Sequence, residues 1–309
     1  MLGELPLDLL LSPWALALVG LAVGSFLNVV IHRLPIVLER QWWGDVAAQL
    51  NDHDGHKRVF GSAPTPALLQ AGEQLHKQVD ALAPFGLARP ASRCPSCGHR
   101  IRWFENIPLL SWLALRARCS ACGTRISARY PLVELVTGAL FAGIAWRVGA
   151  QPVALWWCGF AAALVALSLI DWDTTVLPDA LTLPLLWAGL VAAAFGFGLT
   201  PAAAITGAAV GYLSLWAVYW LFKLTTGKEG MGYGDFKLLA ALGAWLGWQA
   251  ILPIVLAASI IGAVIGLGMK ASGALREGRY VPFGPFLAGG GLAVVLIGLT
   301  PILEFIGWA

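Results

Sequence analysis

Two aspartates, Asp171 and Asp235, stand at the ends of long apolar runs. Asp171 follows the run 153–170, and Asp235 opens the run 235–248. Ionisable side chains at membrane depth are costly and mark function by default. Two carboxylates a few ångström apart share one proton, because both cannot ionise together. The ionised group then activates a water for attack on a peptide carbonyl, and the protonated group donates to the developing oxyanion. We therefore predict a proteolytic pair.

Other charged residues near this pair have simpler interpretations. Asp173 lies two residues after Asp171 and should face another way, into solvent. Asp179 follows Pro178 at the start of an apolar run, which favours a helix cap. Asp235 could also cap a helix. Lys237 fits the excess of basic residues expected on one side of a membrane.

Four cysteines form two C-x-x-C-G units, Cys94 with Cys97 and Cys119 with Cys122, separated by 21 residues. Each unit supplies two thiolates to one tetrahedron, and its glycine permits the tight turn behind the second sulfur. Disulfides are the alternative, which a reducing compartment disfavours. The spacing predicts a zinc site. With all four positions filled by sulfur, that site is structural and not catalytic.

The elements that must position these residues are apolar helices. The 309 residues are 58% hydrophobic and 12% charged, against roughly 25% charged in soluble domains. The pattern predicts an all-α polytopic membrane protein with about eight transmembrane helices. A small cytoplasmic zinc-binding subdomain lies between the first and second helices. The expected helices cover residues 14–31, 132–148, 153–170, 180–197, 202–222, 235–248, 250–269 and 284–303.

The basic residues predict the orientation. With the N-terminus outside, the inward loops are 32–131, 171–179, 223–234 and 270–283, and they hold or adjoin nineteen of the 20 Lys and Arg residues. Only Arg147 then lies outside. The positive-inside rule thus places both termini outside, and the soluble loop and both aspartates in the cytoplasm.

Three regions follow: residues 1–31 with the first transmembrane helix, the loop 32–131, and a seven-helix core over 132–309. The zinc subdomain occupies about 90–130 of the loop. It is rich in arginine, which could indicate nucleic acid, but a tether between spans favours anionic lipid as partner. An amphipathic helix is expected around 66–82, and residues 37–90 receive no role.

The motifs together resemble a known family over nearly the whole chain. The shared segments are Gly24-Ser-Phe-Leu-Asn28-Val-Val-Ile-His-Arg33-Leu-Pro35, the two cysteine pairs, Asn106-Ile-Pro-Leu-Leu-Ser-Trp112, Ile126-Ser-Ala-Arg129-Tyr-Pro131-Leu-Val-Glu134, Asp171 with Leu177-Pro178-Asp179, and Gly232-Tyr-Gly234-Asp235-Phe-Lys237. In this order they resemble the bacterial type IV prepilin peptidases, membrane aspartic proteases of the GxGD type that also methylate their product.

The resemblance implies an inner-membrane enzyme with two activities. It would cleave the leader of type IV prepilins and of type II secretion pseudopilins on the cytoplasmic side, after a glycine that ends a short basic leader. The new N-terminus would then be methylated with S-adenosylmethionine. By motif match, Asp171 and Asp235 would be catalytic and the four cysteines would hold zinc. No fingerprint marks an S-adenosylmethionine site; Glu134 and Asn106 are candidates by resemblance alone.

Two other functions fit parts of the sequence. Paired membrane aspartates also serve proton- or cation-coupled transporters, although transport sites lie near the midplane and not at span ends. A non-catalytic zinc-bearing assembly scaffold would explain the cysteines. That scaffold would leave Asp171 and Asp235 without a purpose.

Overall fold

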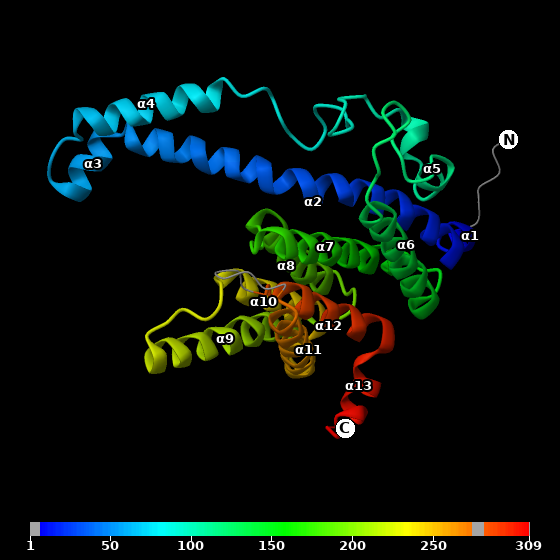
Figure 1. Cartoon of the computed structure of the whole chain (residues 1–309). Helices are drawn as coiled ribbons and strands as arrows, with labels where there is room; N and C mark the ends of the chain where they lie inside the picture. The colour runs from blue at the N-terminus through cyan, green and yellow to red at the C-terminus, as the bar shows by residue number, and fades with distance from the viewer. Residues whose placement is uncertain (1–6, 274–280, 309) are drawn as a thin grey trace.

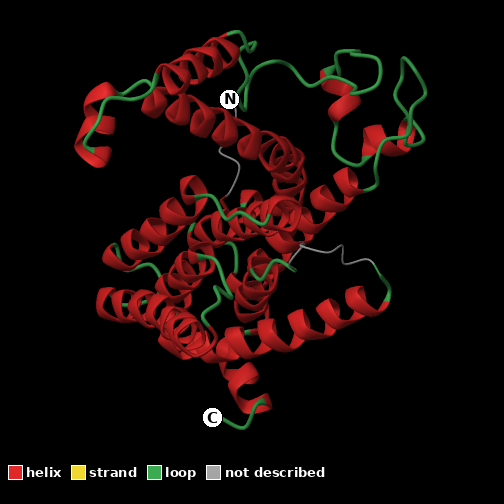
Figure 2. Ribbon diagram, turned by 60° about the vertical axis from the view of Figure 1, so that its left-hand side comes forward, coloured by secondary structure: helices red, strands yellow, loops and turns green. Residues whose placement is uncertain are grey.

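The computed structural model describes residues 7–273 and 281–308. In this part of the chain all regular structure is helical, apart from two isolated bridges (Figure 2). Part of the predicted inward loop 270–283, and the first and last residues of the chain, lie outside the described residues. The longer helices are α2 (Pro13–Leu50), α4 (Pro66–Asp80), α6 (Arg129–Val148), α7 (Val153–Thr174), α8 (Asp179–Ala194), α9 (Pro201–Thr226), α10 (Tyr233–Leu246), α11 (Ile251–Ala271) and α12 (Gly284–Ile297).

Short helices fill the connections. They are α1 (Leu7–Leu10), α3 (His53–Phe60), α5 (Leu110–Ala114), α13 (Leu299–Phe305), and the 3₁₀ turns η1 (Trp103–Asn106) and η2 (Trp248–Ala250). Three helices begin at a Ser-Pro or Thr-Pro pair, where the hydroxyl accepts a hydrogen bond from the first turn and proline occupies the first helical position. Ser12, Thr65 and Thr200 cap α2, α4 and α9 in this way.

Each of the eight predicted ranges contains a helix, so the all-helical prediction is confirmed. By length and composition the described residues hold five helices able to cross a membrane: α2, α6, α7, α9, and η2 with α11. A sixth is counted if α12 and α13, bent by 108°, form one span. The prediction of about eight is larger because α8 and α10 have only 16 and 14 residues, whereas a full crossing takes about 20.

Helix α10 is the centre of the bundle. It packs against α8, α9 and α12, and nearly every residue from Asp235 to Leu246 is buried. Phe236, Leu238, Leu239 and Leu242 are fully enclosed by the main hydrophobic cluster. A helix surrounded by protein need not match the thickness of a bilayer, and this accounts for its length.

Helix α2 continues far beyond the predicted end of the first span at residue 31. It runs through Pro35 to Leu50, and α4 packs back along its second half (Figure 1). Arg33 donates to the carbonyls of Gly86 and Leu87, and both Arg33 and Arg40 lie over the ring of Phe85. These contacts hold the helix together past its internal proline. The amphipathic helix expected at 66–82 is confirmed as α4.

Small residues bring two helix pairs into backbone contact. A Cβ atom on Gly20 or Gly24 of α2 would meet α6 at Gly138 and at the Cα of Glu134. On the other side of the bundle, Gly207 of α9 faces Gly243 of α10 so closely that a Cβ on either would overlap the other's carbonyl group. Close approach of this kind is the expected use of paired glycines in membrane helices.

The contact between α9 and α10 predicts a strong effect of one methyl group. Gly243→Ala should lower the stability of the detergent-solubilised protein by about 1–3 kcal/mol, because the new Cβ would overlap the Gly207 backbone. Thermal unfolding measures it. Gly159→Ala in α7 is the matched control, since a Cβ there has no neighbour within 4 Å. An equal, small shift in both variants would contradict the prediction.

Candidate active site and metal centre

Asp171 lies in the last turn of α7 and points into the bundle. Its side chain is 4% exposed, and its Oδ2 accepts a hydrogen bond of 3.0 Å from the Gly284 N–H at the start of α12. The helix ends just beyond, where Thr175 has a left-handed backbone (φ 56°) and donates its N–H to the Asp171 carbonyl at 2.7 Å. The carboxyl group is thus fixed between the end of one helix and the beginning of another.

Asp235 lies in the first turn of α10 and is 8% exposed. Its Oδ1 is a buried side-chain atom without a hydrogen-bond partner among the described residues. The side chain does not cap its own helix, because the cap position is Gly232 and no side-chain cap bond forms there. An unpaired buried carboxyl oxygen is costly and calls for a functional explanation.

The two carboxyl groups share one small region of the protein. Leu177, in the loop between α7 and α8, packs against Gly234, which precedes Asp235, and against Gly284, which binds Asp171. A Cβ on Gly234 would lie 2.9 Å from Leu177 Cβ, and a Cβ on Gly284 would lie 3.1 Å from Leu177 Cδ1. Leu177 therefore lies between the residue before Asp235 and the residue that binds Asp171, which places both aspartates in the same region of the bundle.

The glycines before Asp235 do different things. Gly234 lets Leu177 approach the backbone, and Gly230 packs against the ring of Phe222. A Cβ on Gly232 would have no neighbour within 4 Å, and nothing in the structure explains this glycine. Close approach of a neighbouring side chain therefore explains Gly230 and Gly234.

The neighbouring charged residues form two ion pairs. Lys237 Nζ lies 2.7 Å from both carboxylate oxygens of Asp179. Asp179 is the first residue of α8 and makes no cap bond, so its prediction as a helix cap was wrong. Asp173 was expected to be solvated, but Arg129 at the start of α6 binds it through two bonds of 2.9 and 2.6 Å. One member of each pair lies two residues after an aspartate of the candidate site: Asp173 after Asp171, and Lys237 after Asp235.

Gly284 is the site residue that the sequence interpretation missed. It lies in Val281-Pro-Phe-Gly284-Pro-Phe286, where prolines flank the glycine at the start of an apolar run. Proline in the first turn of a helix marks a fixed helix start. That signal could have placed a helix N-terminus here, but the meeting with Asp171, 113 residues earlier, depends on tertiary structure.

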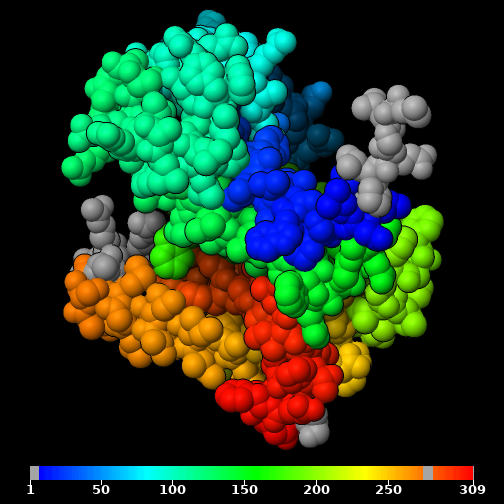
Figure 3. Space-filling view, turned by 90° about the vertical axis from the view of Figure 1, so that its right-hand side faces the viewer, coloured from blue at the N-terminus to red at the C-terminus, as the bar shows by residue number. Residues whose placement is uncertain are grey.

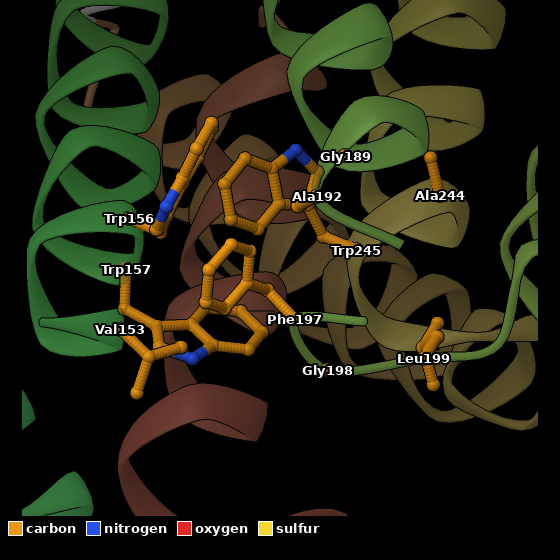
Figure 4. A pocket seen from close by; sticks show the side chains of 10 residues that line it. All are labelled: Val153, Trp156, Trp157, Gly189, Ala192, Phe197, Gly198, Leu199, Ala244 and Trp245. Atoms are coloured by element: carbon orange, nitrogen blue, oxygen red, sulfur yellow. The ribbon is translucent and has the colours of Figure 1, made fainter. Parts of the chain in front are cut away.

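A small aromatic pocket lies far from these carboxyl groups. Trp156, Trp157, Phe197 and Trp245 surround it, and Gly189 makes room for the Trp245 ring (Figure 4). The pocket begins at Val153, so along α7 it is about 27 Å from Asp171. It contains no ionisable side chain, and the tight packing of its rings indicates a structural role.

The four predicted metal ligands come together in the loop between α2 and α6. Their Sγ atoms all lie within 4.8 Å of one another, with Cys94 to Cys122 at 3.8 Å and Cys97 to Cys119 at 4.0 Å. A tetrahedron with zinc–sulfur bonds of 2.3 Å has edges of about 3.8 Å. The separations are too long for disulfides, which need about 2.05 Å. The quartet fits a zinc ion.

The two cysteine turns have the same backbone geometry. In each, the N–H of the first cysteine donates to the carbonyl five residues on, His99 or Thr124, and the glycine after the second cysteine is left-handed. Gly98 and Gly123 both have φ of 71°, a conformation that glycine adopts without strain. The predicted function of these two glycines is confirmed.

Glu105 connects the two turns. Its carboxylate accepts hydrogen bonds from Ser120 Oγ at 2.5 Å and from the Arg102 N–H at 2.8 Å, and lies 3.2 Å from His99 Nε2. The hydrogen bonds from Ser120 and Arg102 lower the pKa of Glu105 to about 2. The ionised carboxylate therefore holds the cysteine turns together at all ordinary pH values.

This subdomain forms a lobe at one end of the molecule (Figure 3). The Leu109 N–H donates to Glu134 Oε2 on α6 at 2.8 Å, and Asn106 Nδ2 lies 3.5 Å from Ser25 Oγ on α2. Arg129 ties the base of the lobe to Asp173. The lobe is therefore attached at the same end of the bundle as Asp171.

Comparison with known families agrees with this architecture. Residues 18–148 match the Bacterial Peptidase A24 N-terminal domain, and residues 158–267 match the Type IV leader peptidase family. The first match covers α2 through the cysteine lobe to the end of α6. The second covers α7 to α11 and includes both aspartates. No solved structure matches the chain.

Similar proteins align with this chain over most of their own length. The chain is 51% identical to a protein of Pseudomonas putida over 279 residues, covering 90% of this chain and 88% of the relative. It is 48% identical to a protein of Burkholderia pseudomallei (strain 1026b) over 93% of this chain and 86% of the relative. A Pseudomonas aeruginosa protein is 47% identical over 94% and 93%. All three carry the name prepilin leader peptidase/N-methyltransferase.

The sulfur geometry predicts the metal content. The purified protein should hold about one zinc per chain, as one closed tetrahedral site requires, and the double variant Cys94→Ser/Cys97→Ser should lose it. Elemental analysis by mass spectrometry gives the ratio. Cys158→Ser is the matched control, because this cysteine is buried in α7 outside the quartet and should leave the zinc in place. Wild-type protein without zinc would refute the site.

Proposed function

The chain belongs to the type IV leader peptidase family, and we propose that Asp171 and Asp235 are the catalytic pair of a membrane aspartic endopeptidase. The enzyme cleaves the leader of prepilins and N-methylates the new N-terminus, in agreement with the names of its relatives. The catalytic assignment is supported by the burial of both carboxyl groups, in the last turn of α7 and the first turn of α10, and by the unpaired oxygen of Asp235.

The chemistry follows from two carboxyl groups that share one proton. The ionised group takes a proton from a water molecule, whose oxygen attacks the scissile carbonyl. The protonated group donates to the carbonyl oxygen as negative charge develops there. When the intermediate collapses, the proton taken from water passes to the leaving amine, and the proton given to the carbonyl oxygen returns to the carboxylate that donated it, so that cleavage is balanced and the pair again holds one proton. The Gly284 N–H supports this by fixing Asp171, while Asp235 Oδ1 stays free to bind the attacking water or the substrate.

Neither alternative function has support. Transport sites lie at the bilayer midplane, whereas Asp171 lies in the last turn of α7 and Asp235 in the first turn of α10. A scaffold without catalysis does not explain why both carboxyl groups are buried. The relatives named as peptidase and methyltransferase align with both halves of the chain.

The protein is a multi-pass membrane protein, and its placement in the bacterial inner membrane is part of the proposal. We place the cysteine lobe and the aspartates on the cytoplasmic side and both termini outside, following the distribution of basic residues. Contacts among four predicted inward segments support one common side: Arg129 with Asp173, Lys237 with Asp179, Gly234 with Leu177, and Gly284 with Asp171.

The partners follow from the same assignment. The substrates are the N-terminal segments of prepilins and, by the family resemblance, of type II secretion pseudopilins. S-adenosylmethionine supplies the methyl group when bound. Zinc holds the cysteine lobe through Cys94, Cys97, Cys119 and Cys122, and takes no part in cleavage because its four ligand positions are filled by sulfur. The basic surface of the lobe favours contact with anionic membrane lipid.

Substitution of either aspartate tests the catalytic pair. Asp171→Asn and Asp235→Asn should each lower the rate of prepilin cleavage about 100-fold or more, because an amide can neither accept nor release the shared proton. Mass spectrometry of a prepilin peptide incubated with purified enzyme measures it. Asp45→Asn, an exposed aspartate on α2, is the control and should cleave normally. Processing at the wild-type rate by either site variant would end the assignment.

Gly284→Ala tests how Asp171 is held. A Cβ at this position would lie 2.5 Å from Asp171 Oδ2, so the carboxyl group must move. We expect kcat for cleavage to fall about tenfold to 100-fold, with little change in KM, because small misplacements of catalytic groups have effects of this size. Gly289→Ala in the same helix is the control, since a Cβ there has no neighbour within 4 Å. Equal kinetics of the two variants would contradict the role of Gly284.

A further inference from the structure

Glu134 is a buried carboxylate that the proteolytic mechanism does not use. In the described ranges the buried acidic residues are Glu134, Asp171 and Asp235, and Glu134 is 8% exposed. It lies on α6, one of the helices able to cross a membrane. Ionisable residues in such helices mark function by default and need a partner.

Among the residues that the structure describes, Glu134 has no cationic partner. None of the ion pairs among the described residues includes it. Its Oε2 accepts only the backbone N–H of Leu109 at 2.8 Å. Leu109 has φ of 59° and ψ of −49°, a strained backbone for a residue with a side chain, and strain of this kind collects at functional sites. A cation from outside the protein would supply the missing partner.

Polar groups also lie where α2 approaches Glu134 and the cysteine lobe. Gly24 brings α2 against the Cα of Glu134, and Ser25 and Asn28 follow on the same helix. Asn28 Nδ2 donates to the Tyr130 carbonyl at 3.1 Å, one turn before Glu134. Asn106 Nδ2 reaches Ser25 Oγ at 3.5 Å, three residues before Leu109. Hydroxyl and amide groups thus line the junction of α2, α6 and the cysteine lobe.

Methyl transfer from S-adenosylmethionine to an amine is a reaction of cations. The amine nitrogen forms a bond to the methyl carbon while the carbon–sulfur bond breaks, and the electron pair of that bond stays on sulfur. The positive charge therefore moves from the sulfonium to the nitrogen and is never lost. A single buried carboxylate can face this charge before and after the transfer.

We propose that the junction of Ser25, Asn28, Asn106 and Glu134 binds a cation of the methyl-transfer reaction, with the Glu134 carboxylate as its counter-charge. The site rests on the proposed methyltransferase activity and gives it a location. Two sources share this chemistry: the α-ammonium of the trimmed substrate and the sulfonium of the methyl donor. Both are compact cations attached to larger molecules, and binding experiments can separate them.

Binding without turnover tests the proposal. Four ligands are compared on the detergent-solubilised full chain: a trimmed prepilin peptide with a free or an acetylated N-terminus, S-adenosylmethionine, and the neutral thioether S-adenosylhomocysteine. Wild-type enzyme should prefer the cationic member of at least one pair. Glu134→Gln keeps an oxygen to accept the Leu109 N–H but removes the charge, and should weaken that cationic ligand about tenfold or more, with little effect on its neutral counterpart.

Two further variants separate charge from packing. Glu134→Asp keeps the charge and should retain the preference for the cation, whereas Glu73→Gln removes an exposed carboxylate on α4 and should behave as wild type. In Glu134→Gln the ratio of methylated to unmethylated cleavage product should fall by the same factor as the affinity. The ligand pair that Glu134→Gln no longer distinguishes identifies the source of the cation. Loss of the preference for the free over the acetylated peptide indicates the ammonium, and loss of the preference for S-adenosylmethionine over S-adenosylhomocysteine indicates the sulfonium.

Two results would overturn the site. The first is that wild-type enzyme binds neither cationic ligand more tightly than its neutral counterpart, a result that needs no folded Glu134 variant. The second is that wild type and Glu134→Gln have equal affinities for both cationic ligands. Peptide cleavage by the wild-type preparation is measured in parallel, so that absence of the peptidase itself, which would defeat the proposed function, is distinguished from failure of the Glu134 site.

Discussion

The structure depends on the burial of two carboxyl groups, Asp171 and Asp235, in one region of the bundle. Asp171 and Asp235 are 4% and 8% exposed, and none of the ion pairs among the described residues includes either. Isolated buried charge is expensive, and sharing one proton lowers that cost. Helix packing and one hydrogen bond offset the rest of that free-energy cost. Helix α10 is enclosed by α8, α9 and α12, and the start of α12 brings one N–H to Asp171.

Two ion pairs hold this arrangement from outside. Asp173 and Lys237 each lie two residues beyond a site aspartate, and each is bound through two hydrogen bonds to another helix, at Arg129 and Asp179. Partly exposed pairs of this kind contribute only about 0–1 kcal/mol to stability. Their contribution is to position the helices: one pair connects the start of α6 to the end of α7, and the other connects the starts of α8 and α10. They also neutralise Asp173 and Asp179, whose free charges would otherwise act on the site.

The parts of this picture that follow from local sequence were predictable. Apolar runs gave the positions of the helices, and C-x-x-C-G spacing gave the cysteine quartet. The failures concern contacts between distant segments. Asp179 looked like a helix cap because a proline precedes it, and its partner Lys237 lies 58 residues away. The extension of α2 past Pro35 depends on packing by α4 and on Arg33 and Arg40, which a propensity argument does not include.

Helix α6 connects the region of the proposed proteolytic residues with the proposed cation site at Glu134. Arg129 at its start binds Asp173, next to the proteolytic site, while Glu134 lies five residues further on, about 7.5 Å along the helix axis. The amine that is methylated does not exist until the peptide bond is cut, so cleavage must come first. A product released beside α7 then has only a short path to the junction of α2 and α6. The cysteine lobe contacts that junction through Leu109, and Glu105 connects the two cysteine turns of the lobe. A lobe organised by the cysteine quartet can therefore matter for methyl transfer without touching the residues proposed to cut the peptide.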